Sequence, residues 1–584
     1  MDNGAVLDIT DCRRYFLEPR EARQRQYEAL RAYFVDNLPS AEVARRFGYT
    51  RGSFRVLCHA FRRTAQPDFF SPKPETGRRP LSRMAQARDQ AVALRKQNYS
   101  VYEISETLKE RKIDLSPTAI RQILREEGFA PLPRRLDEER PEKPGPQAEA
   151  TADARAFGLT ESSFETVCGG LFLFLPDLAR LGIEGVAQQA GLPGSKMIPA
   201  AHALRSALAL KLWSIERKSH VMALVADPGL ALFPGLNVIP KKSYLSEYSH
   251  GIDHARTLRL LAAWQDAGAG EGLCASDSFN LDFHSVPYYG EDPAIERHYV
   301  SMRSRRQPSV LAFLAQDSAS RAFCYSNADL RKGDEPGEVF RFLEFWKKQH
   351  GKLPRELVFD SKLTTYASLA RLNEMGVQFI TLRRRDARLL EQIAELPRSA
   401  WRTIELDNVT RRFRTPRVCE TSVTLAGCAL RQLFIQDLGH EEPTILLTNQ
   451  SAATAKRLMT RYAQRMLIEN SISDSVRFFH SDALSSSVGM KVDFDMALLV
   501  IASGLYRILA ARMRGYSDAQ ARRVFRDLID MPASVATTPT EVRVHFHRRA
   551  HLPIILASGI LDTKTTIPWW NNATLTFASW GKDR

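Results

Sequence analysis

The sequence has few cysteines, and none of them are arranged as in a metal site or a disulfide framework. Its seven cysteines are scattered along 584 residues, and no two of them form a C-x-x-C pair. An odd number of scattered cysteines is typical of reduced thiols rather than of a secreted, disulfide-linked fold. We therefore expect no structural zinc site.

The sequence also lacks an apolar run long enough to cross a bilayer, which needs about 20 residues. The run Leu171–Leu175 ends at Pro176, and the run Met496–Leu509 contains Gly504 and Arg507. The first residues have neither a basic head nor an apolar stretch, so we expect no secretion signal. These features favour a cytoplasmic protein without a membrane partner.

An excess of negative charge is absent as well, because the chain carries a formal net charge of +15 and has a pI of about 9.5. The charge is uneven: residues 1–135 hold 26 Lys and Arg against 17 Asp and Glu. A basic excess of this size indicates a polyanionic partner, either nucleic acid or an anionic membrane. The hydrophobic content of 44% is sufficient for packed cores. At about 100–200 residues per domain, the length predicts several domains.

Two short helical modules are predicted in the basic N-terminal part. In the first, over residues 1–70, we expect a helix at Glu21–Phe34, a short helix capped by Ser40, and a last helix at Arg51–Arg63. Gly48 is suited to the tight turn before the last helix. This layout is typical of a helix-turn-helix, whose last helix enters the major groove of DNA. The expected DNA contacts on this helix are Arg51, Arg55 and Arg62.

The second module, over residues 80–135, repeats the layout. A helix is expected at Ala85–Lys96, a short one after a capping box of Ser100 and Glu103, and a third one capped by Ser116. The expected DNA contacts on the third helix are Thr118, Arg121 and Arg125. For either module the alternative is a plain three-helix bundle without a role in DNA binding.

Composition and periodicity divide the rest of the chain into further segments. From Gly272 a helical pattern gives way to three strands and then to alternating helices and strands, which predicts a mixed sheet flanked by helices. The predicted fold class is therefore multidomain α/β. Its segments after the two modules are a linker at 136–155, a helical domain at 156–270, an α/β core at 271–385 and 452–535, a β-rich segment at 386–451, and a tail at 536–584.

Three acidic residues lie in the kinds of element that often carry catalytic carboxylates: a strand, the end of a strand and a helix. Asp277 lies in the predicted first strand, and Asp360 ends a short buried strand at its carboxyl end, where open α/β sheets place ligands. Glu469 lies on a long predicted helix, where Tyr462 and Arg465 share its face. Carboxylates from separate elements suit hard cations such as Mg²⁺, and two such ions stabilise phosphodiester cleavage.

Each of these residues also has an ordinary structural interpretation. An Asp at a strand end is most often a turn or cap residue, and a Glu four residues after an Arg is usually part of a surface ion pair. Asp282, Asp493 and Asp495 compete with the three residues, although the last two are expected to cap a helix that starts near Phe494. The ordered set, rather than any single residue, indicates catalysis.

From about residue 272 to residue 513 the sequence resembles the cut-and-paste DDE transposases of bacterial insertion sequences. That family has an Asp in an early strand, an Asp that ends a later strand, and a helical pattern Tyr-x2-Arg-x3-Glu-x6-Lys. Asp277, Asp360 and the segment Tyr462–Glu469 match these three elements. Val476 stands at the position of the Lys, and Arg477 follows it.

The resemblance implies an RNase H-like catalytic core that carries the β-rich insertion. It implies that Asp277, Asp360 and Glu469 bind Mg²⁺, with Mn²⁺ as a substitute, and catalyse strand cleavage and strand transfer. Tyr462, Arg465 and Arg477 would then contact DNA. Trp401 would stack on a base, with a core position as its alternative.

The implied partners are double-stranded DNA, both inverted repeat ends and target DNA, and a second copy of the chain in a homodimer on DNA. The implied location is the bacterial cytoplasm, in association with the nucleoid. Two alternatives stay open at this point. One is a domesticated DNA-binding regulator without catalysis, and the other is a structure-specific DNA nuclease.

Overall fold

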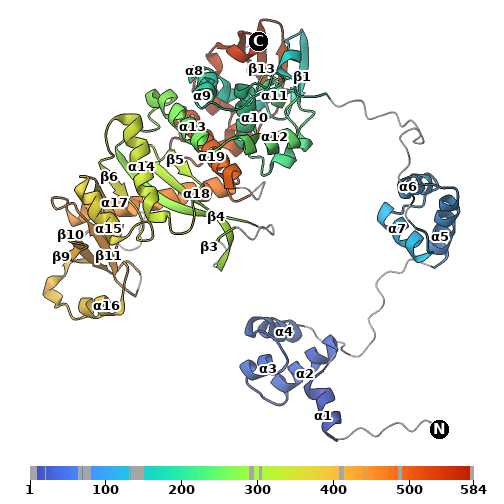
Figure 1. The fold of residues 1–584 in the computed structure, drawn as a ribbon, viewed down its shortest axis with the longest axis horizontal. Coiled ribbons are helices and arrows are strands. Elements are labelled where there is room, and N and C mark those ends of the chain that lie inside the picture. The colour runs from blue at the N-terminus through green and yellow to red at the C-terminus, as the bar shows by residue number, and fades with distance from the viewer. Residues whose placement is uncertain are drawn as a thin grey trace. The chain divides into compact units, whose positions relative to one another are not determined.

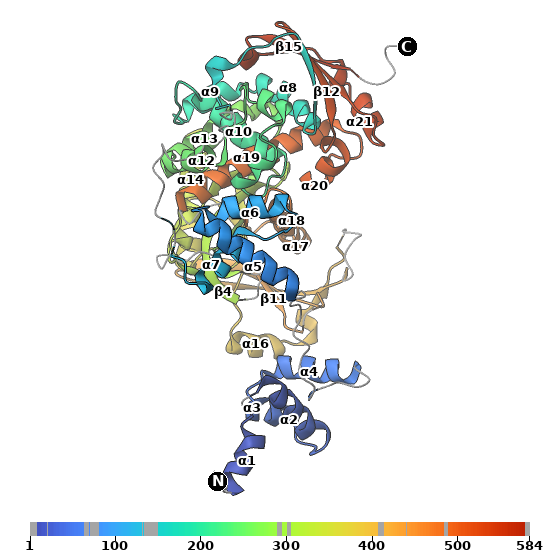
Figure 2. The same ribbon diagram turned by 90° about the vertical axis from the view of Figure 1, so that its right-hand side faces the viewer.

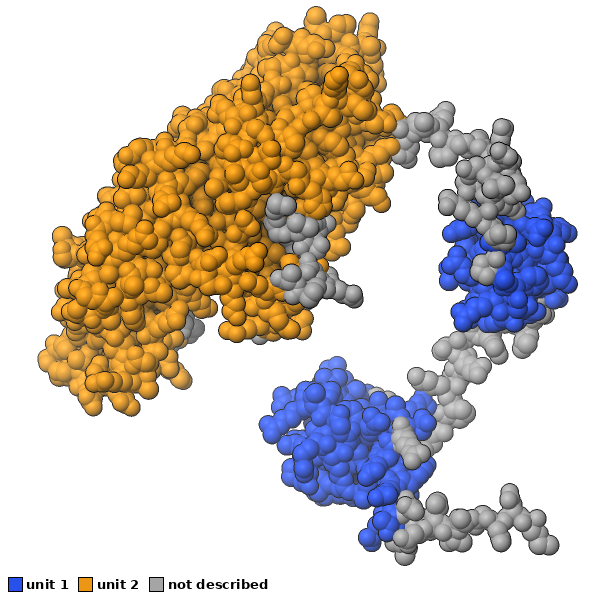
Figure 3. Space-filling view, in the orientation of Figure 1, with its two compact units in different colours: residues 1–145 blue, residues 146–584 orange. Residues whose placement is uncertain are grey.

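The computed structural model describes residues 9–19, 21–63, 69, 81–130, 132, 150–288, 295–300, 305–406, 414–439, 441–483 and 489–578. The chain divides into two compact units, residues 1–145 and residues 146–584, which Figure 3 distinguishes by colour. The described residues form both helices and mixed sheets. The predicted multidomain α/β fold class is therefore confirmed.

The first unit contains a leading helix and two groups of three helices, each with its own apolar core. The first core includes Val43 and Phe54, and the second includes Ile104 and Ile120. Its helices are α1 (Ile9–Leu17), α2 (Ala22–Phe34), α3 (Ser40–Arg46), α4 (Arg51–Arg63), α5 (Leu81–Lys96), α6 (Val101–Glu110) and α7 (Pro117–Glu126).

Local capping signals explain where α6 and α7 begin. Ser100 and Glu103 form the predicted capping box of α6, and the Ser116 hydroxyl accepts a hydrogen bond from the backbone of Ala119, 3.3 Å away, at the start of α7. The prediction for Ser40 is wrong, because α3 starts at this residue and Pro39 occupies the cap position without a side-chain bond. Gly48 has a φ of +70° in the turn before α4, as expected for glycine.

The second unit is built on a ten-stranded mixed sheet with the order β3-β4-β2-β6-β7-β11-β10-β9-β8, in which β5 also pairs with β4. The strands β5, β4 and β2 are antiparallel, whereas β2, β6 and β7 are parallel. The strands are β2 (Ser278–Pro287), β3 (Arg297–Val300), β4 (Arg305–Asp317), β5 (Phe323–Asn327), β6 (Glu356–Val358), β7 (Gln378–Leu382), β8 (Arg402–Thr403), β9 (Arg417–Leu425), β10 (Cys428–Gln436) and β11 (Thr444–Thr448).

Helices pack against this sheet and form much of the rest of the unit (Figure 1). They are α8 (Leu175–Arg180), α9 (Ile183–Gln189), α10 (Ala200–Leu212), α11 (Pro228–Leu232), α12 (Lys242–Tyr248), α13 (His254–Ala267), α14 (Glu335–His350), α15 (Tyr366–Glu374), α16 (Ala387–Ala394), α17 (Ala455–Gln464), α18 (Met466–Arg477), α19 (Gly489–Arg512), α20 (Ala521–Val524) and α21 (Leu552–Ala557). The β-rich insertion adds its strands to the same sheet, because β11 pairs with β7.

The second sheet joins two segments that lie far apart in the sequence. Its order is β1-β12-β13-β15-β14, and Ser162 in β1 pairs with Thr537 in β12. Figures 1 and 2 show α8 and α9 beside these strands. Residues 536–578 of the predicted tail therefore belong to a folded sheet, which also includes β1 of the predicted helical domain. The strands are β1 (Ser162–Thr166), β12 (Ala533–Thr537), β13 (Glu541–Phe546), β14 (Thr565–Ile567) and β15 (Ala573–Ala578).

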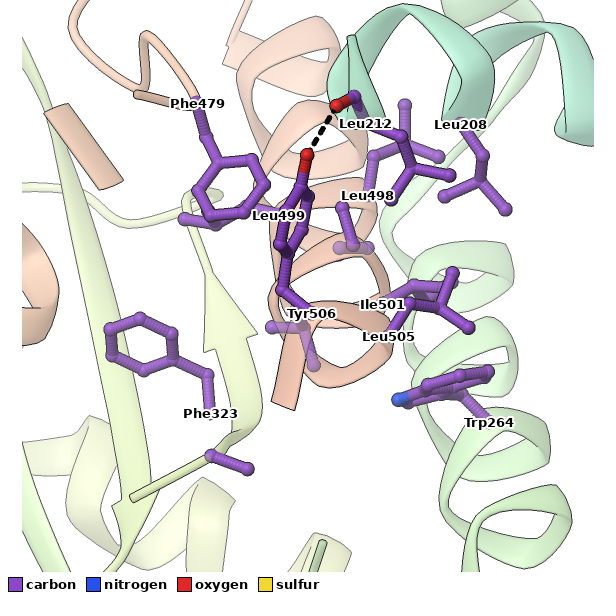
Figure 4. Close-up of a cluster of buried hydrophobic side chains, with 14 of the residues drawn as sticks. Leu208, Leu212, Trp264, Phe323, Phe479, Leu498, Leu499, Ile501, Leu505 and Tyr506 are labelled. Carbon is purple, nitrogen blue, oxygen red and sulfur yellow. Dashed lines mark hydrogen bonds between the residues drawn. The ribbon is translucent and has the colours of Figure 1, made fainter. Parts of the chain in front are cut away.

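Helix α19 lies in the core of the second unit. Its segment Lys491–Arg512 is long and apolar enough to cross a membrane by composition, but 78% of the most apolar window is buried inside the protein, as in a core helix. Figure 4 shows Tyr506 of this helix donating a hydrogen bond to the carbonyl of Leu212 at 2.7 Å. A buried tyrosine hydroxyl needs such a partner.

Gly170 lies where the segment after β1 contacts the segment before β12, so a substitution there tests this contact. A Cβ atom at this position would overlap the backbone carbonyl of Ile529, which cannot rotate away as a flexible side chain would. We expect Gly170→Ala to lower the free energy of unfolding by about 3 kcal/mol or more. Gly185→Ala in α9 is the control, because no atom lies within 4 Å of its added Cβ. This control should change stability by at most about 1 kcal/mol, in the stabilising direction. Equal denaturation midpoints for both variants would contradict the close contact.

Candidate active site beside β2 and β6

Asp282, Asp360 and Glu469 come together beside the main sheet from three separate elements. Asn280 in β2 pairs with Val358 in the parallel strand β6, so Asp282 and Asp360 each lie two residues further along neighbouring chain segments. Glu469 lies in the first turn of α18. The charges of both Glu469 and Asp360 act on Asp282. The structure therefore brings two of the three predicted catalytic carboxylates together, with Asp282 as their neighbour.

Arg465 links the helix carboxylate to the strand carboxylate. Its guanidinium donates to Asp282 Oδ2 at 3.1 Å and to Glu469 Oε1 at 2.8 Å, and its side chain is only 9% exposed. Burial acts to lower the pKa of Arg465, but the neighbouring charges, Asp282 foremost, raise it overall. The buried Nε atom of Arg465 has no hydrogen-bond partner within the described part of the chain. It is a buried donor whose hydrogen-bonding capacity is unused.

Asp282 is the most perturbed carboxyl of the site. Burial is the main cause that raises its pKa to about 6, and the charges of Glu469 and Asp360 act in the same direction. Arg465 and a backbone hydrogen bond from Phe283 at 2.9 Å act against this increase. Three carboxyl groups with one arginine carry excess negative charge in a partly buried place. Such a place favours a cation, and hard oxygen donors suit Mg²⁺.

Tyr462 lies next to Arg465 on the same helical face. Burial raises the pKa of the Tyr462 phenol to about 12, so its hydroxyl keeps its proton at neutral pH. The guanidinium carbon of Arg465 is 5.7 Å from the centre of the Tyr462 ring. The site thus combines a neutral O–H donor, a permanent cation and three carboxyl groups.

The helix that carries these residues tightens at Arg465. The amide of Arg465 bonds to the carbonyl of Tyr462 at 3.0 Å, and the amide of Ile468 bonds to the carbonyl of Arg465 at 2.9 Å. Both bonds span three residues instead of four, so the single helix predicted over 453–479 is divided into α17 and α18. A short tightened stretch within a helix often marks a functional position.

A buried polar network fixes α17 on the sheet one turn before Arg465. Arg461 donates to Glu356 Oε1 at 2.7 Å, to Asn280 Oδ1 at 2.7 Å and to Ser278 Oγ at 2.9 Å. Gln450 also donates to Glu356, at 2.9 Å. Arg461 lowers the pKa of Glu356 although burial, the largest effect, acts to raise it. Ser278, Asn280 and Asp282 alternate along β2, so Arg461 and Arg465 contact one face of the same strand.

The structure does not bring Asp277 to the other two predicted carboxylates. Asp277 precedes β2 instead of lying within it, and its carboxylate pairs with Arg355 at 3.3 Å. Its carbonyl accepts hydrogen bonds from the backbone of Arg355 and Glu356. Asp282 lies five positions after Asp277. In a strand this offset spans about 16 Å, and an odd offset would place the two side chains on opposite faces. The placement of Asp277 in the first strand is therefore wrong.

The alternation along β2 was the signal that could have identified Asp282. Polar Ser278, Asn280 and Asp282 alternate with apolar Phe279 and Leu281. This pattern marks one face of the strand as the polar face. Only the register with β6, however, shows that Asp282 is the residue level with Asp360.

The structure also corrects the interpretation of two competing acidic residues. Helix α19 begins at Gly489, so Asp493 and Asp495 lie inside the helix rather than capping it. Asp493 is buried and bonds to His254 Nδ1 at 2.8 Å, whereas Asp495 pairs with Lys218 at 3.5 Å. Both residues have structural partners away from the carboxylates of the candidate site.

The other predicted contact residues of the second unit are dispersed. Arg477 is exposed in the last turn of α18, and the preceding Val476 is buried. Trp401 is half-buried against a small apolar cluster that includes Leu389 and Phe434, with the Arg417 guanidinium 5.9 Å from its ring. These contacts match the core alternative for Trp401.

In the first unit, the predicted contact residues are exposed on the last helix of each three-helix group. On α4, Arg55 and Arg62 lie four and eleven positions after Arg51. On α7, Arg121 and Arg125 lie three and seven positions after Thr118. Each set therefore lies along one helical face. The residues are Arg51, Arg55 and Arg62 on α4, and Thr118, Arg121 and Arg125 on α7.

Among the residues that the structure describes, no three His, Cys, Asp or Glu side chains lie close enough together to hold a metal ion as they stand. Arg465 bonds to both Asp282 and Glu469, which is consistent with carboxylates that are too far apart to share a metal ion in this state. No protein-family model matches the chain, and no curated protein gives a significant match to it.

The raised pKa of Asp282 predicts a pH-dependent effect of Asp282→Asn on stability. The folded protein binds the Asp282 proton more tightly than the unfolded chain, since the pKa rises from 3.8 to about 6. Asp282 therefore lowers stability progressively as the pH rises from 4 through 6, by on the order of 3 kcal/mol at neutral pH. Asp282→Asn should stabilise the protein in metal-free denaturation near neutral pH and have little effect near pH 4.

Asp277→Asn serves as the matched control for this measurement, because the Asp277 side chain is 34% exposed and pairs with Arg355. It should have little effect on stability near neutral pH. A destabilised Asp282→Asn variant at neutral pH would show that the carboxylate of Asp282 is not strained by its surroundings.

Proposed function

We propose that this chain is a DNA transposase that cleaves and joins DNA strands at Asp282, Asp360 and Glu469. The observation that carries the proposal is the convergence of these carboxylates around Arg465. In the DDE pattern, Asp282 then takes the role of the first Asp that the sequence suggested for Asp277. Tyr462, Arg465 and Glu469 keep the roles that the resemblance implies.

The topology of the sheet supports an RNase H-like core. Three antiparallel strands, β5, β4 and β2, lie beside the parallel strands β6 and β7. Asp282 lies in the central strand β2, and Asp360 follows β6 directly. The carboxyl ends of parallel strands are the usual place for a ligand in open sheets.

The three carboxylates would hold two Mg²⁺ ions, with Mn²⁺ as a substitute. When bound, the metal would stabilise charge on the attacking and leaving oxygens of the phosphodiester. A bound cation would also keep Asp282 ionised against the burial that raises its pKa. Arg465 is then released from part of its pairing with the carboxylates and offers its guanidinium, including the unpaired Nε, to a phosphate oxygen.

The three-helix groups of the first unit support the helix-turn-helix interpretation. In each group a short helix precedes a helix with exposed basic residues on one face, α3 before α4 and α6 before α7. We infer that α4 and α7 enter the major grooves of the inverted repeat ends. A homodimer on two DNA ends follows from the need to join them, and the same site then acts on target DNA.

One observation favours a second candidate function. Arg465 already satisfies two of the three carboxylates, and the site holds no ready metal cage within the described residues. A DNA-binding regulator that retains the fold without catalysis would have these features. A structure-specific nuclease is separated from a transposase by its products, because it cuts branched DNA without joining ends.

The choice between Asp282 and Asp277 gives the sharpest test of the catalytic proposal. The substrate is a linear duplex that carries the inverted repeats flanking the gene, incubated with Mg²⁺ and a target plasmid. We expect Asp282→Asn to lower the rate of strand cleavage by at least about 100-fold. The loss of a residue that only hydrogen-bonds to a metal ligand already lowers metal affinity or activity by about 10- to 100-fold. Asp277→Asn should cleave and join like the wild type.

Other outcomes of this experiment identify the alternatives. Binding of the duplex by the wild type without any cleavage indicates the regulator. Cutting without joined products indicates the nuclease. Normal cleavage by Asp282→Asn together with loss of cleavage by Asp277→Asn would overturn the assignment of Asp282.

The DNA-binding part of the proposal is tested separately by the salt dependence of binding. Each phosphate contact adds nearly one unit to the slope of log K against log salt concentration. We expect Arg55→Ala on α4 and Arg121→Ala on α7 to weaken binding and each to reduce this slope by about 1. Arg31→Ala is the control, because Arg31 is paired with Glu28 and Asp36. Equal slopes for all three variants would remove α4 and α7 from the interface.

A further inference from the structure

A two-stranded ribbon, formed by β3 and residues 305–308 of β4, extends past the end of β2. Strand β2 ends at Pro287, which pairs with Ser309, whereas residues 305–308 of β4 pair with β3 instead. Figure 1 shows β3 beyond the end of the sheet. Asp282 lies in the second half of β2, five positions before Pro287. The ribbon therefore leaves the sheet at the end of β2 that is nearer to the candidate site.

One face of the ribbon is exposed and the other is largely buried. Tyr299 and Arg306 form a directly opposed pair, and Arg297 lies two positions before Tyr299, so these three side chains share a face. All three are exposed, Tyr299 to 50%. On the other face Val300 and Gln307 are buried. The ribbon thus presents two arginines and a tyrosine to solvent.

The exposed face of the ribbon continues the face of the sheet that carries Asp282. Asp282 pairs with Leu314 in β4, and directly opposed side chains lie on one face. Arg306 lies eight positions before Leu314, and an even offset along a strand keeps the same face. At about 3.3 Å per residue, this offset spans roughly 26 Å. A duplex rises about 3.4 Å per base pair, so the same span corresponds to roughly eight base pairs.

The two arginines of this face have no acidic partner within the described residues. Arg297 donates to the backbone carbonyl of Arg306 at 3.3 Å, and neither guanidinium forms an ion pair. Glu296, which precedes Arg297 in the sequence, pairs with His298 at 3.3 Å and accepts from the backbone of Lys332 at 2.6 Å. Exposed, unpaired guanidinium groups beside a tyrosine hydroxyl are donors that suit phosphate oxygens.

The shape and charge of the ribbon favour duplex DNA as its partner. The major groove of DNA is wide enough to admit a two-stranded ribbon. The chain as a whole carries a formal net charge of +15, which attracts a polyanion. Contacts from arginine and tyrosine to phosphate fix the orientation of a duplex and carry no sequence information. The ribbon therefore suits a role in positioning DNA.

We propose that Arg297, Tyr299 and Arg306 bind the phosphate backbone of the duplex that is cleaved, about eight base pairs from the cleaved bond. The contact orients this duplex and does not read its sequence. The inference rests on the proposed function, since it takes Asp282 as the position of the cleaved bond. It adds a positioning surface that is separate from the carboxylates and from helices α4 and α7.

The first experiment measures the salt dependence of binding by the full-length protein without Mg²⁺, so that the DNA stays uncut. The duplex carries one inverted repeat and its flanking DNA. We expect Arg297→Ala combined with Arg306→Ala to lower the slope of log K against log salt concentration by about 2. Arg297→Lys combined with Arg306→Lys keeps both charges and should keep the slope.

Arg305→Ala is the matched control, because Arg305 is an exposed neighbour on the opposite face of the ribbon and bonds to Gln307 at 3.3 Å. This variant should also keep the slope. Thermal unfolding of every variant identifies any that fails to fold, and the doubly lysine-substituted protein shows whether the ribbon tolerates substitution at both positions.

The second experiment locates the contact on the duplex. An uncharged methylphosphonate replaces one phosphate at a time on both sides of the junction between repeat and flank. Neutral phosphates about six to ten base pairs from the junction should weaken binding by the wild-type protein. The variant with Arg297→Ala and Arg306→Ala should be insensitive at these positions, and Tyr299→Phe should be insensitive at one neighbouring phosphate. The side of the junction shows whether the ribbon holds the repeat or the flank.

The outcomes distinguish the ribbon from the enzyme. Cleavage by the wild-type protein with Mg²⁺, together with an unchanged slope in the doubly alanine-substituted variant, overturns the ribbon and leaves the transposase proposal intact. A lower slope and matched insensitivity in a protein that never cleaves support the ribbon as a DNA contact and overturn the transposase proposal. A lower slope without a sensitive phosphate on either side overturns the assignment to the cleaved duplex. An equal loss of slope in Arg305→Ala overturns the assigned face.

Discussion

The ion pairs of Arg465 hold the candidate site together, because they join helix α18 to strand β2 through Glu469 and Asp282. Without a positive charge, three carboxyl groups in one partly buried place would repel one another and protonate. Arg465 keeps the helix and strand side by side in the absence of a cation. The same contacts would have to loosen if the proposed metal ion were to bind, so the arginine would then be both the support of the site and a competitor of the ion.

The network around Arg461 explains how a helix can be held in register on a sheet by polar contacts. Burying an Arg–Glu pair is a poor way to increase stability, since well-packed apolar residues of similar volume serve as well or better. Arg461 nevertheless bonds to Glu356, Asn280 and Ser278 in the interface. Directional bonds of this kind allow one register, and the register determines where Glu469 lies, two helical turns further on.

Local features were predictable from the sequence, and non-local ones were not. The capping box of α6 and the bounds of α4 depend on neighbouring residues, and the structure confirms them. The choice between Asp277 and Asp282 depends on how β2 aligns with β6. Ser278 in β2 pairs with Glu356 in β6, 78 positions further along the chain, and no local signal specifies that alignment. The folded sheet at residues 533–578 was missed for the same reason, because β12 finds its first partner in β1.

The pairing of β1 with β12 has a consequence for how the protein is made. A ribosome must synthesise Ala533–Thr537 before the edge of Ser162–Thr166 can be covered. The helices of the first unit rely only on close neighbours and can fold while translation continues, whereas long-range pairing is slow and late. A nascent chain therefore acquires its two small bundles first, and its large unit closes only after β12 has been synthesised.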